Sequence, residues 1–414
     1  MSVCLEACAP CRARNFEIRP RIDLKVNEEE PIGIEEEKDF VKPVKDLCGF
    51  IRPRRLEIAF LGGAHSGSVR HYADESFGRL DQGFFPCGAA SENSDIGSMF
   101  KELKHWKQPR NTTRSMHPGS GGRTRAVVKV QDGCNANCSF CIIPSVRGRS
   151  RSIEPEAALS EIRQLVERGY KEIVLSGIHL GTYGRDLHPN HSFYELVCRS
   201  LDVPGLERLR LSSIEPLEVV PELIDLVAAH PRMARHFHIP LQSGSARILK
   251  AMYRPYSPQF YIDLLSRIRD RMPAAGLGAD VMVGFPGETD NDFDATYQLV
   301  LRSPLTYLHV FPFSSRPETV AADLPQRIPD HVARFRGKLL RNLIAQKNEM
   351  FRRQLIGADI EVLTLDDGAA ISSNFVRVSL PENIPKNRWV RVFVTGLTDG
   401  GLQASRITTA HETN

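Results

Sequence analysis

The strongest constraint on the fold of this chain is a change of sequence pattern at Arg125. From there to about residue 355, short runs rich in β-branched residues alternate with longer amphipathic segments. Such alternation is typical of consecutive βα units, which build a parallel sheet covered by helices. The expected strands lie at 125–131, 171–177, 208–214, 235–243, 276–286 and 307–314. The expected helices lie at 154–170, 221–230, 258–270, 289–303 and 330–355. This order predicts a partial (β/α) barrel with its ligands at the carboxyl ends of the strands.

The other parts of the chain follow different patterns. Residues 1–115 form an atypical N-terminal region with acidic runs and scattered Gly and Pro, and the Gly/Ser-rich stretch 116–124 is typical of a linker. Residues 125–355 contain the predicted barrel. Residues 356–414 carry short strand patterns joined by Gly, Asn and Pro turns, which predict a small C-terminal β-barrel. The predicted fold class is α/β, with this small barrel added.

Charge and hydropathy limit the cellular compartments and partners expected for this protein. No apolar run approaches the ~20 residues of a membrane-spanning helix, and the N-terminus lacks the apolar centre of a secretory signal. We therefore expect a cytoplasmic protein with no membrane partner, whose cysteines stay reduced. The net charge is only +4, but the helix predicted at 330–355 is strongly basic and could face a polyanion.

Three cysteines follow the first expected strand in the segment "CNANCSFC", at Cys134, Cys138 and Cys141. Three thiolates this close together can hold one cubane iron-sulfur cluster, which usually takes four protein ligands. One iron would then stay open for a small chelating ligand at the mouth of the barrel. A zinc knuckle is the alternative, but no second CxxC or histidine pair follows at zinc-finger distance.

The segment "CLEACAPC" has the same spacing, at Cys4, Cys8 and Cys11, in a poorer context. It lies near a chain terminus, no strand pattern precedes it, and Pro10 separates its last two cysteines. Two interpretations stay open: these cysteines bind a second iron-sulfur cluster, or their spacing is incidental.

A series of further motifs accompanies the central cysteines. They are "DGCNANCSFCIIPSVRGRSRS", "GYKEIVLSGIHLGTYGRDL", "RLRLSSIEP", "HFHIPLQSGSARILKAMYRPY", "DVMVGFPGET" and "LHVFPFSSRPET". Together they resemble the radical S-adenosylmethionine methylthiotransferases over about residues 125–409. The motifs "SSIEP" and "LHVFPFS" favour the branch that adds a methylthio group to N6-threonylcarbamoyladenosine beside the tRNA anticodon. Related branches acting on isopentenyladenosine or on a ribosomal protein stay open.

The resemblance implies a [4Fe-4S] cluster and S-adenosylmethionine as cofactors. Cys134, Cys138 and Cys141 would hold the radical-generating cluster, and Phe140 would pack near the adenine. Further cofactor contacts are implied at residues ending successive strands, namely Ser176, Gly177, Ser213, Glu215, Gln242 and Gly284. From the residues alone, Ser213 and Gln242 fit helix caps or partners of buried backbone equally well, and Gly284 fits a turn.

The resemblance also implies tRNA as a partner. Arg147, Arg149 and Arg151 match the arginine-rich stretch of the family and would bind RNA phosphates or the cofactor carboxylate, with a solvated basic loop as the alternative. The C-terminal barrel resembles the TRAM module, which binds tRNA in this family. Its candidate phosphate contacts are Arg352, Arg353, Lys386, Arg388 and Arg391. An electron donor such as flavodoxin or ferredoxin and an unidentified sulfur donor complete the expected partners.

The N-terminal region departs from the family. Members normally begin with a domain whose three separated cysteines, in contexts like "TLGC" and "NTC", hold a second cluster, and neither context occurs here. Three readings follow: a working methylthiotransferase in which "CLEACAPC" supplies the missing ligands, a degenerate relative without sulfur transfer, or a tRNA-binding protein with the barrel as scaffold. An intact cysteine loop argues against the scaffold.

Overall fold

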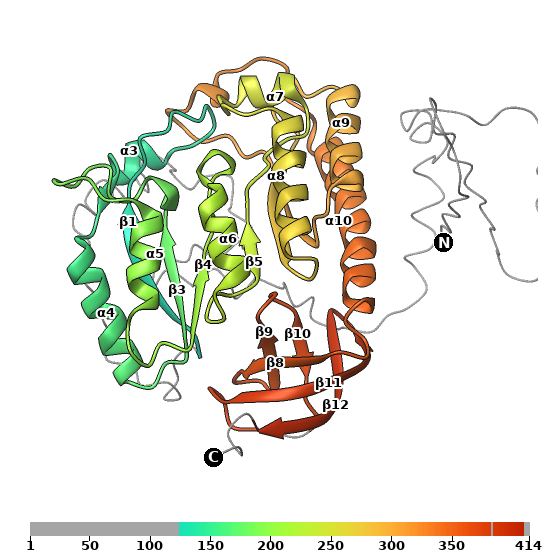
Figure 1. Cartoon of the computed structure of the whole chain (residues 1–414). Helices are drawn as coiled ribbons and strands as arrows, with labels where there is room; N and C mark the ends of the chain where they lie inside the picture. Colours follow the sequence, from blue (N-terminus) through green and yellow to red (C-terminus); the bar gives the residue numbers. More distant parts are fainter. Residues whose placement is uncertain (1–123, 382–383, 410–414) are drawn as a thin grey trace, which may run out of the picture. The chain divides into compact units, whose positions relative to one another are not determined.

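The computed structural model describes residues 124–381 and 384–409, with side chains as far as Ser405. Figure 1 shows a wall of strands with helices on its outer side, followed by a small β-barrel. The expectations for residues 1–123, including "CLEACAPC", the N-terminal region and the linker, lie outside the described residues. Among the described residues, no helix is long and apolar enough to cross a membrane.

The larger region is a partial (β/α) barrel, as predicted. One sheet has the order β2-β1-β3-β4 and the other the order β5-β6-β7, and all neighbours are parallel except β2. Isolated parallel bridges between Leu209 and Met233 and between Ser213 and His238 join the sheets into one curved wall. The strands are β1 (Ala126–Asp132), β2 (Arg151–Ser152), β3 (Glu172–Gly177), β4 (Arg208–Leu211), β5 (His236–His238), β6 (Gly276–Val283) and β7 (Tyr307–Pro312).

Amphipathic helices cover the outer face of this wall. They are α4 (Pro155–Glu167), α5 (Phe193–Leu201), α6 (Pro221–Ala229), α8 (Pro258–Arg271), α9 (Asp290–Arg302) and α10 (Asp330–Arg353). Shorter turns are α3 (Ile143–Arg147), η3 (Leu180–Thr182), η4 (Pro216–Glu218), α7 (Ala246–Ala251) and η5 (Val320–Ala322). The sequence patterns had not predicted α5, although the Ser192 hydroxyl accepts a hydrogen bond from the Glu195 N–H at 3.0 Å, a capping arrangement typical of helix starts.

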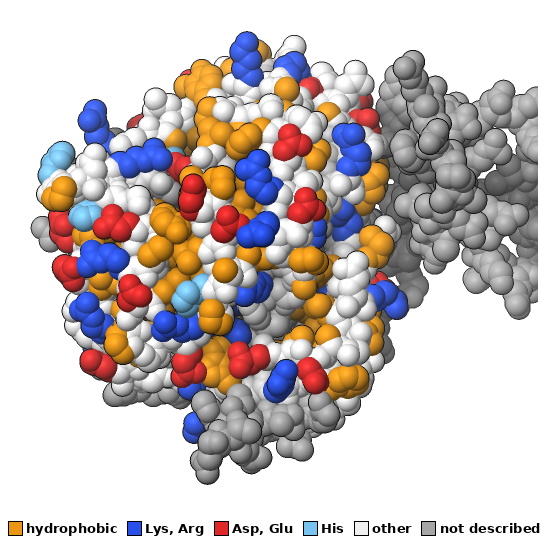
Figure 2. All heavy atoms as spheres, in the orientation of Figure 1, with side chains coloured by type: hydrophobic (Ala, Val, Ile, Leu, Met, Phe, Trp, Pro, Cys, Tyr) orange, Lys and Arg blue, Asp and Glu red, His pale blue; other side chains and the backbone are white. Residues whose placement is uncertain are grey.

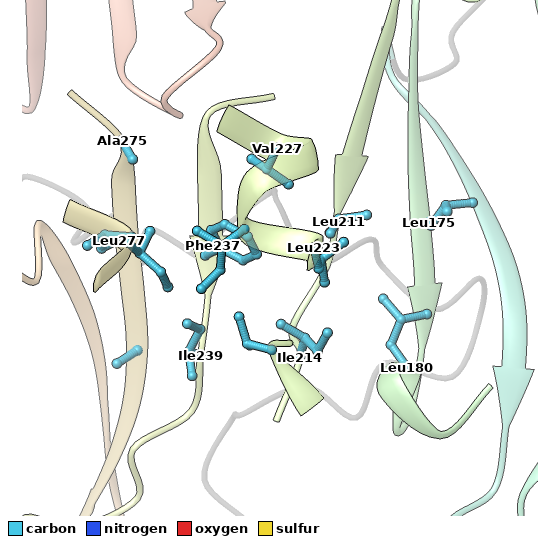
Figure 3. Close-up of a cluster of buried hydrophobic side chains, with 14 of the residues drawn as sticks. Leu175, Leu180, Leu211, Ile214, Leu223, Val227, Phe237, Ile239, Ala275 and Leu277 are labelled. Carbon is cyan, nitrogen blue, oxygen red and sulfur yellow. The ribbon is translucent and has the colours of Figure 1, made fainter. Parts of the chain in front are cut away.

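The main core lies between the sheet and these helices. Figure 3 shows Phe237 of β5 packed beside Leu223 and Val227 of α6, with Ile239 and Leu277 nearby. Because side chains alternate across a strand, the residues next to Phe237 and Leu277 in the sequence point to the opposite, inner face of the barrel. That inner face carries polar groups at several strands, whereas (β/α) barrels usually fill their interior with branched aliphatic side chains.

A closed five-stranded barrel follows α10, in the order β10-β12-β11-β8-β9. Its strands are β8 (Asp359–Thr364), β9 (Ala369–Ser372), β10 (Arg377–Ser379), β11 (Trp389–Thr398) and β12 (Gly401–Thr409). It has a small core of its own, in which Val362, Val378 and Val392 are fully buried. This result confirms the predicted C-terminal β-barrel.

The turn between β9 and β10 contacts the amino ends of the larger barrel's strands. The Phe375 ring lies 4.8 Å from the His236 ring and 5.9 Å from the Tyr307 ring. The Arg210 guanidinium donates hydrogen bonds to the carbonyls of Ser372 and Ser373 at 3.2 and 3.1 Å. This turn therefore closes the end of the barrel opposite to the one where ligands are expected.

Candidate functional site

The three central cysteines lie in the loop between β1 and α3, at the carboxyl end of the first strand. All three are reduced and partly buried. Gly133 begins the loop with φ +70°, and a Cβ there would lie 2.1 Å from the Arg149 carbonyl oxygen, so only glycine fits. Hydrogen bonds from Cys134 N–H to the Gly148 carbonyl and from Cys141 N–H to the Cys138 carbonyl, both 3.1 Å, hold the loop's shape.

Segments distant in sequence anchor the far side of this loop. The Ser139 N–H donates to the Met252 carbonyl at 3.2 Å, and its hydroxyl donates to the Ala251 carbonyl at 2.7 Å. Phe140 packs against a buried cluster that includes Met252 and Phe285. The thiolates are therefore held by a fixed backbone, a donor set that suits three irons of a cubane cluster and leaves the fourth iron open.

A histidine contacts the first cysteine. His179 Nδ1 lies 3.4 Å from Cys134 Sγ, and its Nε2 lies 3.0 Å from Glu218 Oε1. Burial opposes the charged imidazole, but the contacts to Cys134 and Glu218 outweigh it and raise the pKa of His179 to about 9. Burial also opposes the charged form of Cys134 and so raises the pKa of its thiol. Hydrogen bonds from His179 and the Ala136 N–H outweigh this effect, and the pKa of Cys134 lies below its usual range.

An arginine makes the matching contact to the second cysteine. The Arg254 side chain is only 6% exposed, and its Nη1 donates to Cys138 Sγ at 3.2 Å. Its Nη2 pairs with Glu215, and its Nε donates to the Tyr256 hydroxyl at 3.3 Å. By contrast, burial raises the pKa of Cys141. Two of the three sulfurs thus receive a donor from a side chain held by a carboxylate, and both carboxylates, Glu215 and Glu218, belong to the segment around η4.

The other expected cofactor residues lie near the carboxyl ends of the strands. Ser176 and Gly177 end β3, and a Cβ at Gly177 would meet the Gln131 side chain at 3.0 Å. Gln242 has φ 64°, and its N–H donates to the Asp280 carbonyl at 2.8 Å. The Gly284 N–H donates to Glu288 Oε2 at 2.7 Å within a turn of φ +75°, which gives this glycine a structural role. Their contacts with a cofactor stay predictions.

Two expected cofactor residues have protein partners. The Ser213 hydroxyl lies 2.7 Å from His238 Nδ1, so the helix-cap alternative does not describe it. Glu215 holds Arg254, as described above. The sequence assigned no role to His179, Glu218 or Arg254. His179 and Arg254 lie inside the quoted motifs "GYKEIVLSGIHLGTYGRDL" and "HFHIPLQSGSARILKAMYRPY", and Glu218 lies two residues after "RLRLSSIEP".

The expected RNA-binding arginines differ in exposure. Arg149 and Arg151 are exposed, whereas Arg147 is partly buried and lies 3.4 Å from Asp132. Arg352 is buried and donates to the carbonyls of Thr398 and Gly401 at 3.0 and 2.7 Å, so we leave it out of the RNA-binding set proposed below.

The remaining candidates lie on the surface. Arg353 pairs with Glu349, Lys386 pairs with Asp366, and Arg388 and Arg391 are exposed. On the face shown in Figure 2, Lys and Arg side chains are interspersed with Asp and Glu and form no single basic patch.

Known proteins resemble this chain over the region just described. The model of the radical SAM superfamily matches residues 128–300. A threonylcarbamoyladenosine tRNA methylthiotransferase MtaB from Rickettsia prowazekii is 40% identical over 68% of this chain and 67% of its own length. The MtaB protein of Aquifex aeolicus is 33% identical over 72% of this chain and 71% of its own length.

Two further known proteins are similar to this chain. A tRNA-2-methylthio-N(6)-dimethylallyladenosine synthase from Desulfitobacterium hafniense is 37% identical over 64% of this chain and 59% of its own length. Among solved structures, the radical SAM enzyme HemN from Escherichia coli is 12% identical, covers 72% of this chain and 70% of its own, and has a TM-score of 0.40.

Proposed function

Because this chain belongs to the radical S-adenosylmethionine methylthiotransferases and is MtaB-like, we propose that it adds a methylthio group to N6-threonylcarbamoyladenosine beside the tRNA anticodon. Enzymes of this family transfer sulfur-containing groups and use a [4Fe-4S] cluster and S-adenosylmethionine. The observation that carries the proposal is the loop of three partly buried cysteines at the carboxyl end of β1, with donors aimed at two of them.

The protein's own groups would bind and tune the cluster. Cys134, Cys138 and Cys141 would hold three irons, while His179 and Arg254 donate hydrogen bonds that withdraw charge from two sulfurs. Such hydrogen bonds are among the features that set cluster potentials. When bound, the cluster and S-adenosylmethionine supply the reductive cleavage that gives a deoxyadenosyl radical. We infer that a flavodoxin or ferredoxin supplies the electron in the cytoplasm.

The proposed cofactor contacts lie near the carboxyl ends of the strands. Phe140 would pack near the adenine, and Ser176 and Gly177 would face the amino group of S-adenosylmethionine. Gln242 and Gly284 would contact its ribose or methionine part. Ser213 and Glu215 already have histidine and arginine partners, so we assign them a positioning role beside the cofactor.

Binding of tRNA is proposed for two regions. The exposed Arg149 and Arg151 lie just after the cysteine loop, where a substrate nucleoside would have to approach. Arg388 and Arg391 lie on the C-terminal barrel, which we propose to be a TRAM module. Guanidinium groups bind phosphates in pairs of hydrogen bonds, and each such contact makes binding more sensitive to salt.

The substrate can be tested on tRNA from a strain lacking the endogenous activity. The purified protein, a reductant and S-adenosylmethionine are added, and nucleosides are identified by mass spectrometry. We expect 2-methylthio-N6-threonylcarbamoyladenosine. The 2-methylthio derivative of dimethylallyladenosine would favour the second candidate, supported by the Desulfitobacterium relative. Deoxyadenosine formation without either product would contradict both substrates and favour a degenerate enzyme.

Sulfur insertion in the family needs a second cluster, and Cys4, Cys8 and Cys11, which lie outside the described residues, are its candidate ligands, with incidental spacing as the alternative. Iron and sulfide per chain, measured after anaerobic reconstitution, test this ligand set. About eight irons per chain, falling to about four in Cys134→Ala, would support it. About four irons falling to near zero would mean that the "CLEACAPC" spacing is incidental.

A further inference from the structure

A second cluster of metal-ligating side chains lies on the inner face of the barrel and contains no cysteine. His238 of β5, Asp280 of β6 and His309 of β7 come from three neighbouring parallel strands. Asp280 and His309 are directly paired residues in the ladder, so their side chains share one face. Phe237 and Ile239 point to the helices (Figure 3), so His238 between them points to the inner face as well.

The three potential ligand atoms are spaced as an ion would need them. His238 Nε2 lies 3.3 Å and His309 Nδ1 lies 3.2 Å from Asp280 Oδ1, and one ligand atom from each residue lies within 4.8 Å of the others. An ion bound at about 2.0–2.2 Å separates its neighbouring ligand atoms by roughly 3–3.5 Å. The site is also sheltered, since the His238 side chain is 3% exposed and those of Asp280 and His309 are 22% exposed.

A serine supports the most buried of the three ligands. The Ser213 hydroxyl lies 2.7 Å from His238 Nδ1, on the side of the ring away from Asp280. A hydroxyl can accept as well as donate, so it can accept a hydrogen bond from Nδ1–H, which is the tautomer whose Nε2 can bind an ion. Metal-ligating histidines almost always have such a partner on the other ring nitrogen.

The cluster adjoins a cavity that could supply the remaining ligands. This cavity has a volume of about 210 Å³ and is lined by His309 together with Asn348, Asn374 and Phe375. It can hold several waters, since one water in the liquid occupies about 30 Å³. Of the three proposed ligands, His309 lines this cavity, so water held there lies next to the cluster.

We propose that His238, Asp280 and His309 bind one divalent first-row transition-metal ion, with Ser213 positioning His238. Two imidazoles and one carboxylate with open positions are typical of non-haem Fe(II) sites, and the ion is chemically distinct from the thiolate-bound cluster. The inference does not depend on the substrate proposed above. The competing explanation is a closed hydrogen-bonded network in which both imidazoles simply donate to Asp280.

Manganese is the suitable probe for this site. Mn²⁺ prefers carboxylate and other oxygen ligands, so the cysteines of the chain compete for it poorly. The full-length protein carrying its reconstituted cluster in the diamagnetic oxidised state is titrated with Mn²⁺, and free Mn²⁺ is followed by electron paramagnetic resonance. Pulsed measurements on the bound ion then detect coupling to imidazole nitrogen.

We expect one Mn²⁺ per chain with nitrogen coupling, and loss of this binding in Asp280→Asn and His309→Gln. Ser213→Ala should weaken binding about 10- to 100-fold, the usual effect of removing a histidine's supporting partner. His236→Gln is the matched control, because His236 is another buried histidine of β5 outside the cluster, and its Mn²⁺ affinity should equal that of the unmodified protein. Circular dichroism of each variant confirms that it is folded.

Three results would overturn the proposal. The first is the absence of stoichiometric Mn²⁺ binding to the unmodified protein, which would identify the cluster as a hydrogen-bonded network. The second is binding that lacks nitrogen coupling or that persists in folded Asp280→Asn, which would place the ion at surface carboxylates. A folded His236→Gln variant that loses binding as fully as Asp280→Asn would equally contradict the assignment of ligands.

Discussion

Replacing Glu172 by Gln should destabilise the protein by about 3 kcal/mol. Glu172 is completely buried at the amino end of β3, and one of its carboxylate oxygens lies 2.7 Å from Arg210 Nε. Arg208 Nη1 and Arg125 Nη1 lie 3.6 and 3.8 Å from the carboxylate. The Arg208 and Arg210 side chains are themselves 6% and 3% exposed, so the variant would leave buried positive charges without their counterion.

Two independent considerations give this magnitude. Removing one partner of a buried ion pair costs about 3–5 kcal/mol. Burial alone would raise the pKa of Glu172, but its three arginines, chiefly Arg210, outweigh burial and lower it from 4.5 to about 2. That difference corresponds to about 3 kcal/mol of favourable interaction with the ionised form.

Urea unfolding at neutral pH, followed by circular dichroism, measures the effect. The matched control is Glu156→Gln, because Glu156 also pairs with arginines but is 72% exposed, so its loss should cost no more than about 1 kcal/mol. A decrease in the Glu172 variant as small as that of the control would refute the reasoning.

The lowered pKa of Glu172 predicts that its contribution to stability depends on pH. A carboxyl group whose pKa is lowered in the folded protein stabilises the fold fully at pH values above its pKa in the unfolded chain, 4.5. This contribution is lost as the pH falls towards the pKa in the folded protein, about 2. The stability difference between the unmodified protein and Glu172→Gln should therefore be constant above about pH 5 and narrow as the pH falls below 4.5. A difference that stays constant to pH 3 would show that the carboxylate's charge is not its source.

Three further predictions concern the site and the RNA. Cys134→Ala should abolish formation of deoxyadenosine from S-adenosylmethionine without unfolding the protein, and a folded variant that cleaves at the unmodified rate would contradict the cluster assignment. Arg254→Lys should lower the cluster's reduction potential in a redox titration, by at most about 60–130 mV, because a charge-assisted hydrogen bond of about 1.5–3 kcal/mol to Cys138 is lost. The control is Arg267→Lys, which replaces an exposed arginine of α8, and equal potentials of the Arg254 variant and the unmodified protein would exclude this role. Arg391→Ala should weaken tRNA binding and reduce the slope of log affinity against log salt by about one, and an unchanged slope would remove Arg391 from the interface.

The sequence by itself determined the features that depend on neighbouring residues. The alternation of strand and helix patterns predicted most elements of the (β/α) barrel, and the cluster loop was visible because its three cysteines lie within eight residues. Helix α7 was missed because its six residues are too few for a periodic pattern to stand out. The arginine at position 352 was expected at the surface because basic residues usually lie there, and only the docking of the C-terminal barrel buried it.

The tertiary structure alone decided which distant residues meet. His179 and Arg254 lie 45 and 116 positions from the cysteines that they contact, and His238, Asp280 and His309 come from three separate strands. The meeting of His238, Asp280 and His309 depends on strand register, because a shift of one residue would turn such a side chain to the opposite face of the sheet. Local patterns predict that a strand forms. Its register is settled by the packing of the whole barrel, and so is the chemistry of the barrel's inner face.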